Sequence, residues 1–387
     1  MKTIGIFTGY FIPHLGGVER YVDKLSGALQ RIGYRVVVIT TSDGTQKEYE
    51  EDGTRCVYRL PILKLFKERY PIPRRDESYN RLIKAIYEEE IDYFIINTRF
   101  HLTSLIGARM ANKTSKPCIL IEHGTGHFSV GVKYLDFIGA IYEHALSGVL
   151  KKYVAHYYGV SKKCVEWLRH FGIKGHGVFY NAIDKEDAEI ADDRYKECYA
   201  ENVTLITYAG RLIKEKGVLN LIDAYQDLIK KNPMMNVRLA IAGDGDLMHF
   251  LKDKYGDDES IDLLGKLNRK DMMSLYARTD IFAHPSQYPE GLPTSILEAG
   301  LMECAIVATP RGGTEEVIVD GNHGIIVEGS ASSLYEALYL YINDKDLRQR
   351  SAVNIKKRVE TIFEWNSVAK QVGEVVERLS KDEKYAR

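Results

Sequence analysis

The sequence predicts an α/β protein made of two Rossmann-like, doubly wound units. Short apolar runs rich in Val, Ile and Tyr alternate with longer segments of helical period, which is typical of βαβ units around a parallel sheet. This alternation runs twice along the chain. At 387 residues, the chain also exceeds what one hydrophobic core usually organises. We therefore expect two domains.

The first unit is expected over residues 1–182, followed by a polar linker over residues 183–202. The predicted strands of this unit lie near residues 3–8, 35–40, 92–97, 117–122 and 154–160. Its predicted helices lie near residues 18–32, 77–89, 102–112, 132–150 and 162–170.

The second unit is expected over residues 203–363. Its predicted strands lie near residues 203–208, 237–242, 261–264, 280–284, 305–308 and 324–327, with a helix from about residue 218. Residues 331–381 are helical in pattern throughout. Phe363 and Trp365 within them predict packing onto a large apolar surface.

Composition favours a cytoplasmic protein. No apolar run reaches the roughly 18 residues of a membrane span. The first apolar run, residues 3–8, is too short for a signal-peptide core. The five cysteines lie far apart without metal-ligand spacing, which is typical of a reducing compartment.

Charge is divided unevenly between the two halves. Residues 1–182 carry 26 Lys and Arg against 18 Asp and Glu, a net +8, which leaves –9 for the remainder. Residues 59–84 mix basic and apolar side chains, which suits either an anionic membrane surface or a solvated loop and helix face. We expect peripheral association with the inner face of the cell membrane through this segment. No recognised motif accompanies the charge, so nucleic acid is not an expected partner.

One glycine-containing turn follows the first strand of each unit. Gly16 and Gly17 open a helix, where backbone N–H groups and the helix dipole favour a phosphate, although a purely structural turn is an equal alternative. In the second unit, Arg211 and Lys216 follow the strand, where open α/β sheets bind their ligands. Two cations there indicate a diphosphate site rather than a solvated turn.

The stretch Pro289–Ala299 is the most informative in the sequence. Pro293 fits the first helical position, so Glu290 lies in the loop before the helix and can face a ligand. The N–H groups of Gly291 and Leu292 lie at the helix N-terminus, without intrahelical partners. Thr294 and Glu298 are four residues apart and share a helix face. A carboxylate at position 298 suits the two neighbouring hydroxyls of a ribose.

Two further polar loops give weaker signals. Residues 121–127 end a strand with His123 and His127, either of which suits a hydrogen bond to a sugar, a titrating role or simple packing. The Asp244-x-Asp246 pair has the spacing of a metal site. We reject that interpretation because Asp344-x-Asp346 has the same spacing at a helix start, where aspartate serves as a cap.

Taken together, these motifs resemble glycosyltransferase family 4, a retaining family with the GT-B fold, along nearly the whole chain. The resemblance implies two Rossmann-like, doubly wound domains that face each other across a cleft. The Glu-x7-Glu signature of that family matches Glu290 and Glu298. Its glycine loop matches Gly16-Gly17, its Gly-Arg-Leu…Lys-Gly segment matches residues 210–217, and its Gly-Asp-Gly turn begins at Gly243.

The resemblance implies roles for these residues. It implies that Arg211 and Lys216 bind the donor diphosphate, Glu298 the ribose, and Glu290 the transferred sugar. His123 matches the active-site histidine of the family. The matching donor-site positions also include Gly16, Gly17, Gly243, Gly291, Leu292, Pro293 and Thr294, with Gly265, Lys266 and Leu267 near the nucleobase. The last helix, residues 364–387, is expected to cross back to the first domain.

The expected activity is transfer of a hexose from a nucleotide diphosphate sugar, UDP-sugar before GDP-sugar, to a glycan or lipid-linked glycan in surface polysaccharide assembly. No cofactor or metal is expected. A nucleotide-sugar epimerase or phosphorylase of the same fold and a non-catalytic nucleotide-sugar-binding subunit remain as alternatives. A nicotinamide-dependent oxidoreductase comes last, because neither unit carries the dinucleotide glycine pattern.

Overall fold

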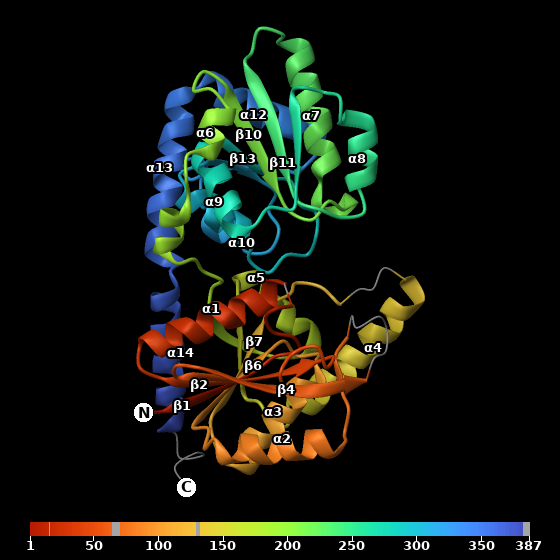
Figure 1. The fold of residues 1–387 in the computed structure, drawn as a ribbon, viewed down its shortest axis with the longest axis vertical. Coiled ribbons are helices and arrows are strands. Elements are labelled where there is room, and N and C mark those ends of the chain that lie inside the picture. The colour runs from red at the N-terminus through yellow and green to blue at the C-terminus, as the bar shows by residue number, and fades with distance from the viewer. Residues whose placement is uncertain (15, 64–69, 129–131, 382–387) are drawn as a thin grey trace. The chain divides into compact units, whose positions relative to one another are not determined.

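A computed structural model of the chain describes residues 1–14, 16–63, 70–128 and 132–381. The chain forms two compact units, one of residues Met1–Asn181 with Trp365–Arg387 and one of residues Ala182–Glu364. Each unit is a mainly parallel sheet between layers of helices (Figure 1). The predicted α/β class and the repetition of one doubly wound architecture are confirmed.

The first unit contains a sheet of order β3-β4-β2-β1-β6-β7-β8-β9, with β5 paired to β4. All pairs are parallel except β3 with β4 and β4 with β5. The strands are β1 (Thr3–Phe7), β2 (Arg35–Ser42), β3 (Tyr49–Asp52), β4 (Arg55–Leu63), β5 (Ile72–Pro73), β6 (Tyr93–Asn97), β7 (Cys118–Glu122), β8 (His156–Gly159) and β9 (Gly175–Val178).

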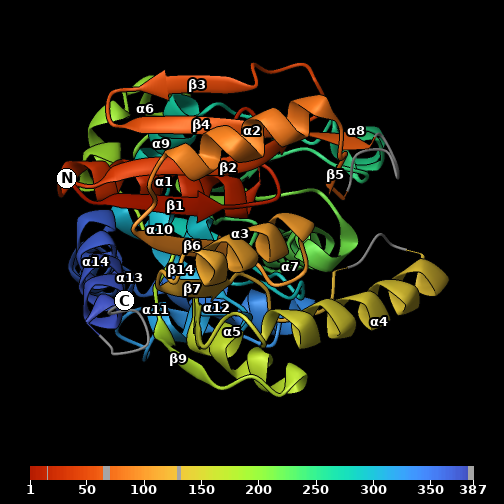
Figure 2. The ribbon, with the colours of Figure 1, turned by 90° about the horizontal axis from the view of Figure 1, so that it is seen from below.

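Helices cover both faces of this sheet, as Figure 2 shows for α2 and α3 on one of them. They are α1 (Gly17–Arg31), α2 (Glu77–Glu88), α3 (Leu102–Lys113), α4 (Lys133–Leu150), α5 (Lys162–Trp167), the 3₁₀ turn η2 (Leu168–Phe171) and α14 (Trp365–Ser380). Helix α14 packs on α1, where the buried Trp365 ring meets the edge of Tyr21 at 5.1 Å. The packing predicted for Trp365 is therefore confirmed.

The second unit has a sheet of order β12-β11-β10-β13-β14-β15, parallel throughout. The strands are β10 (Thr204–Ala209), β11 (Val237–Ala242), β12 (Ile261–Gly265), β13 (Ile281–His284), β14 (Ala305–Ala308) and β15 (Ile325–Ile326). The helices are η3 (Lys185–Ile190), α6 (Arg194–Cys198), η4 (Lys214–Lys216), α7 (Val218–Lys231), α8 (Met248–Tyr255), α9 (Arg269–Arg278), α10 (Thr294–Leu301), α11 (Thr314–Val317), α12 (Ala331–Asn343) and α13 (Lys345–Ile362).

Two local expectations differ from the structure. Residues 183–202 belong to the second unit and do not form a free linker, because η3 and α6 pack on α9. Pro293 is the N-cap residue of α10, and the helix begins one residue later, at Thr294. Asp344, by contrast, caps α13 as expected, since its Oδ1 accepts a hydrogen bond from the Leu347 N–H at 2.8 Å.

The described part of the basic segment 59–84 is divided among β4, β5 and α2. Its first residues lie in β4, where Arg59 is buried and its Nη1 lies 3.1 Å from Glu50 Oε1 on β3. Arg74 and Arg81 form ion pairs with Asp76 and Glu48. Lys64, Lys67 and Arg69 lie outside the described residues. Part of the positive charge is therefore already neutralised within the first unit.

Among the described residues, no helix combines the length and the apolar character that crossing a bilayer requires.

Candidate functional site

Both units place polar side chains at the carboxyl ends of their parallel strands. In the second unit these side chains follow β10 and β13, which are neighbours in the sheet. In the first unit they follow β1, β6 and β7, which are consecutive in the sheet order. Such strand ends are where open α/β sheets bind ligands.

A tight turn brings Lys216 to Glu290 across 74 residues of sequence. Gly217 follows η4 with a left-handed φ of 74°. A Cβ atom at this position would lie 2.2 Å from the Pro285 carbonyl oxygen, so only glycine lets the turn approach the loop after β13 so closely. The Lys216 Nζ consequently forms an ion pair with Glu290 Oε1.

The Glu290 carboxylate is held in its charged form. Burial alone would raise the pKa of Glu290, but His284 and Lys216 lower it to about 2. Ser286 Oγ donates a hydrogen bond to Glu290 Oε1 at 2.9 Å, and His284 Nε2 lies 3.7 Å from the same oxygen. His284 and Ser286 were not predicted as site residues, because a buried strand end looks like core in the sequence.

Arg211 joins this group through an aromatic ring. Its guanidinium carbon lies 5.0 Å from the centre of the Tyr288 ring, and Lys216 Nζ lies 5.2 Å from the same centre. Tyr208 donates a hydrogen bond to the Arg211 carbonyl at 3.0 Å, which fixes the turn. We call Arg211, Lys216, Tyr288 and Glu290 the cationic cluster, since two cations lie over one ring and one of them pairs with a carboxylate.

Glu298 is buried on α10 and has a different partner. Its Oε1 accepts a hydrogen bond from Arg269 Nη1 at 3.0 Å, and Arg269 also pairs with Asp187 of η3. Burial lowers the pKa of Arg269, but Glu298 and Asp187 together raise it above its usual value. Arg269 thus orients the Glu298 carboxylate. Sequence inspection gave no signal for Arg269, because the three residues come from three separate elements.

Glycines set the neighbouring turns. Gly243 has a φ of 142°, and a Cβ atom there would lie 1.8 Å from the Gly210 carbonyl oxygen. Its N–H donates to the Gly265 carbonyl at 2.8 Å, so the expected donor positions Gly243 and Gly265 are adjacent. Gly291 accepts a hydrogen bond from the Gly313 N–H at 2.7 Å, which fixes the loop before α10.

The other donor-site expectations occupy the same strand-end loops. Lys266 is exposed, Leu267 is half-buried, and Leu292 is buried in front of Pro293 and Thr294. Asp244 and Asp246 are both exposed, and Asp244 Oδ1 accepts a hydrogen bond from the next N–H at 2.8 Å. The Asp-x-Asp spacing is therefore part of a turn. Within the described part of the chain, no metal-ligand group includes these two residues.

In the first unit, His123 follows β7 with its ring fixed on two sides. Its Nε2 lies 2.9 Å from Asn97 Oδ1, and the Asn97 amide nitrogen is oriented toward the Phe7 carbonyl at 3.5 Å. This orientation makes Nε2 the donor and leaves Nδ1 as an acceptor. The Tyr21 ring of α1 packs edge-on against His123 at 4.7 Å.

A second histidine, His101, lies beside His123 and was not predicted. A Cβ atom on Gly9 would lie 2.3 Å from His101 Nδ1, so the ring covers the backbone just after β1. Burial lowers the pKa of His101 to about 4. Burial, with a smaller contribution from His101, lowers the pKa of His123 to about 3. Both rings are therefore neutral at pH 7.

A buried ion-pair group supports the loop that carries His123. Arg99 and Glu143 pair at 2.8 Å, and both are at most 2% exposed. Glu122 Oε1 accepts hydrogen bonds from the N–H groups of His123 and Gly124 at 3.0 and 3.2 Å. Burial raises the pKa of Glu122 despite the nearby Arg99. We call Asn97, Arg99, His101, Glu122, His123 and Glu143 the His123 cluster.

The glycine loop of the first unit already holds an anionic group. Gly16 is the N-cap of α1, and a Cβ atom there would lie 2.2 Å from Glu19 Oε2, so Glu19 folds back over the helix start. His14 Nδ1 lies 3.2 Å from Glu19 Oε1. Burial raises the pKa of Glu19. A phosphate at Gly16 and Gly17 would therefore share this helix start with the Glu19 carboxyl group.

Family profiles and known proteins similar to this chain indicate its family. Residues 15–187 match the profile of Glycosyltransferase Family 4, and residues 190–358 match that of Glycosyl transferases group 1. An uncharacterized glycosyltransferase of Methanocaldococcus jannaschii is 28% identical over 386 residues, which cover 97% of this chain and 98% of the relative.

Two further similar proteins come with a named substrate or a bound nucleotide. The UDP-Gal:alpha-D-GlcNAc-diphosphoundecaprenol alpha-1,3-galactosyltransferase of Escherichia coli is 25% identical, over 91% of this chain and 93% of its own. Anabaena HepE, solved in complex with UDP and glucose, superposes with a TM-score of 0.73 at 17% identity, covering 98% of this chain and all of HepE. The two profile matches together span nearly the whole sequence. The chain therefore belongs to the group 1 glycosyltransferases of family 4 and is a glycosyltransferase of the GT-B fold.

Proposed function

We propose that the protein transfers a hexose from a UDP-sugar to a lipid-linked glycan with retention of the anomeric configuration. The observation that carries the donor half of this proposal is the cationic cluster, where Arg211 and Lys216 meet at Tyr288 beside an ionised Glu290. Two fixed cations at a strand end suit a diphosphate better than any neutral ligand.

The cluster supports bond breaking by stabilising the leaving group. When the bond between the anomeric carbon and the phosphate oxygen breaks, negative charge builds up on the diphosphate and positive charge on the sugar. Arg211 and Lys216 stabilise the first of these charges, in geometry that exists before the reaction. Because these side chains supply the positive charge, the donor chemistry needs no divalent cation.

Retention follows from attack on the face that the diphosphate leaves. The acceptor oxygen forms the new bond to the anomeric carbon, and its proton passes to an oxygen of the departing diphosphate. No protein nucleophile takes part in this scheme. Glu290, with a pKa of about 2, stays anionic and accepts hydrogen bonds from the hydroxyls of the transferred sugar.

Glu298 and the backbone of Gly265–Leu267 position the nucleotide end of the donor. Glu298, oriented by Arg269, accepts hydrogen bonds from the two ribose hydroxyls. The backbone of Gly265–Leu267 meets the uracil. His123 is neutral and offers hydrogen bonds to a sugar hydroxyl rather than a charge. The choice of UDP rests on the Escherichia coli relative, whose name specifies UDP-Gal, and on HepE, which was solved in complex with UDP and glucose.

A lipid-linked acceptor is supported by helix α4, not by the basic segment 59–84. Tyr134, Phe137, Ile138 and Ile141 follow helical spacing and are 71, 66, 44 and 56% exposed. The opposite face of α4 is buried through Glu143, Leu146, Ser147 and Leu150. An exposed apolar stripe of this kind suits the acyl region of a membrane or of a lipid carrier.

Product analysis tests the proposal. The protein is incubated with ¹⁴C-labelled UDP-glucose, UDP-galactose or GDP-mannose and a polyprenyl-diphosphate-linked sugar. We expect label from one UDP-sugar in the lipid fraction and an α-anomeric signal in the proton NMR spectrum of the released glycan. A β linkage would overturn retention, and label moving only from GDP-mannose would overturn the choice of base. Free or isomerised sugar without a glycoside would indicate an epimerase.

A further inference from the structure

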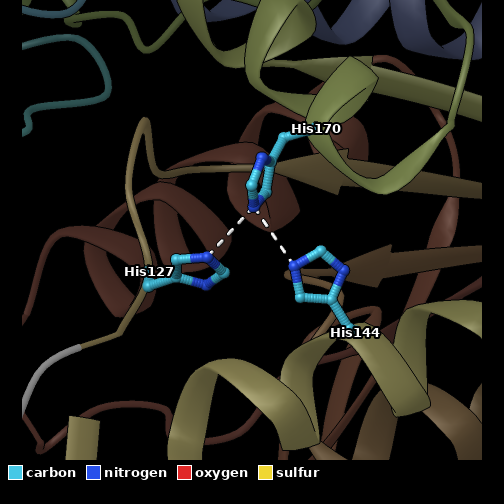
Figure 3. Close-up of side chains that lie close together, drawn as sticks. All are labelled: His127, His144 and His170. Atoms are coloured by element: carbon cyan, nitrogen blue, oxygen red, sulfur yellow. Dashed lines mark hydrogen bonds between the residues drawn. The ribbon is translucent and has the colours of Figure 1, made fainter. Parts of the chain in front are cut away.

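Three histidines from separate elements of the first unit meet at one point that the transferase proposal does not use. His127 lies in the loop after β7, His144 on α4 and His170 in η2. One ring nitrogen of each histidine lies within 4.8 Å of those of the other two (Figure 3). We call these three residues the His trio. The strand-end sites described above do not include it.

The spacing of the nitrogens is that of metal ligands. His170 Nε2 lies 3.1 Å from His127 Nε2 and 3.2 Å from His144 Nε2, and Figure 3 shows the two rings converging on the His170 nitrogen. A tetrahedral zinc ion binds imidazole at about 2.0–2.1 Å, which sets neighbouring ligand nitrogens roughly 3.3 Å apart.

The protons available on the three rings do not satisfy all the close nitrogen contacts, which favours a cation at this point. Glu143 Oε2 lies 3.1 Å from His127 Nδ1, so the Nδ1 proton is donated to the carboxylate and Nε2 is left as a lone pair. One proton shared by the nitrogens of His170 and His144 satisfies at most one of the two close contacts well. A metal ion would accept all three lone pairs at once.

A metal-binding histidine usually makes a further hydrogen bond through its remote ring nitrogen, and the surroundings of the His trio provide such a contact. Glu143 is 2% exposed and holds the His127 ring in place, while its other oxygen accepts the Phe128 N–H at 2.7 Å. A carboxylate bound to the remote nitrogen of a metal-binding imidazole is a recurrent arrangement. The Trp167 ring stacks on His170 at 4.5 Å with an angle of 8°, which fixes that ring as well.

We propose that His127, His144 and His170 bind one divalent transition-metal ion, zinc by preference, with a fourth position open to water. Zinc suits three imidazoles, and His144 and His170 are exposed, so solvent reaches the site. The ion would join the loop after β7 to α4 and η2. That loop begins at His123, so the ion would act as a structural clamp on it and would leave the donor chemistry to the cationic cluster.

Metal titration tests this site without any transferase assay. The protein is purified through a tag without histidine, stripped with a chelator and titrated with Zn²⁺ against a chromophoric competitor. We expect one ion per chain. His144→Ala and His170→Ala should each lower the affinity by more than the roughly 10- to 100-fold that loss of an outer contact costs. Both rings are exposed, so circular dichroism should show an intact fold.

His249→Ala is the matched control, because His249 is 90% exposed on α8 in the other unit. It should bind zinc as the parent does. With Co²⁺ in place of Zn²⁺, the parent and the control should show the visible absorption of a low-coordinate complex, and His170→Ala should not. The site is overturned if no stoichiometric zinc binds, or if all four proteins bind it equally. Either result would leave the donor-site proposal unaffected.

Discussion

The carboxyl ends of the parallel strands carry ionised side chains in the second unit and neutral histidines in the first. In the second unit, Lys216 and Glu290 are ionised and paired, and His284 and Lys216 hold the Glu290 pKa near 2. In the first unit, burial keeps His101 and His123 neutral, with pKa values of about 4 and 3. One architecture thus provides a charged strand end and a neutral one.

This difference shows that strand-end position selects where a ligand binds, whereas neighbouring side chains select its chemistry. A pair of cations with one carboxylate suits a diphosphate sugar. Neutral imidazoles and an asparagine suit hydroxyl groups, and the exposed apolar stripe of α4 belongs to the same unit. Under the proposed function, the second unit is the donor side and the first is the acceptor side. The following experiments test this division.

The largest effect is expected from Lys216→Ala. Loss of one preorganised cation should raise the barrier by about 3–4 kcal/mol, which corresponds to a roughly 10²- to 10³-fold lower kcat. Steady-state kinetics with the labelled donor measure it. Lys214→Ala is the control, because Lys214 lies on the same turn and is exposed. Equal rates for parent and Lys216→Ala, with both folded, would remove the cationic cluster from the mechanism.

Glu298→Gln should weaken nucleotide binding without abolishing it. A hydrogen bond to a charged group contributes about 1.5–3 kcal/mol, so the Kd for UDP should rise roughly 10- to 100-fold in calorimetry. The carboxylate acts on the ribose, so 2′,3′-dideoxy-UDP should bind parent and variant alike.

Glu303→Gln is the control for this measurement, since Glu303 is exposed just beyond the same helix and pairs with Lys356. An equal loss of affinity for UDP and for its dideoxy analogue would contradict the ribose contact.

Acid should destabilise the first unit through its neutral histidines. The folded-state pKa of His123 is lowered, so the unfolded chain takes up the proton first, and stability is lost as pH falls below about 6.5 toward 3. At pH 4.5 this costs on the order of 2 kcal/mol, after allowance for partial exposure.

His123→Gln cannot take up this proton, so its melting temperature should fall less than that of the parent between pH 7.5 and 4.5. Differential scanning calorimetry at both pH values measures the two shifts. His249→Gln, on the surface of α8, should behave as the parent does. Identical shifts for parent and His123→Gln would show that His123 is not held neutral.

The smallest effect is expected from the apolar stripe of α4. Phe137→Ser should weaken flotation with vesicles of phosphatidylglycerol and phosphatidylcholine by about 1 kcal/mol, or roughly fivefold, because part of one aromatic side chain no longer inserts. Leu340→Ser is the control, since Leu340 is 45% exposed in the second unit. If the control weakens flotation as much as Phe137→Ser does, the first unit is not the membrane-facing one.

Local pattern determined much of the fold. The alternation of apolar runs and helical segments located strands β1, β2, β6, β7 and β8 and all those of the second unit to within a few residues. It failed at β4, whose buried Arg59 made a strand look like part of a basic surface segment. The ion pair with Glu50 on β3 offsets the cost of burying Arg59. A partner on another strand cannot be read from the local sequence pattern.

The sequence by itself named most of the residues at the strand ends, because turn glycines, helix starts and cations can be read over a few positions. Only the tertiary structure decided their partners. Lys216 meets Glu290, Arg269 orients Glu298, and the His trio converges from three elements. The reason is physical: backbone preferences act between near neighbours, whereas ion pairs and metal sites depend on which distant segments the packed sheet brings together.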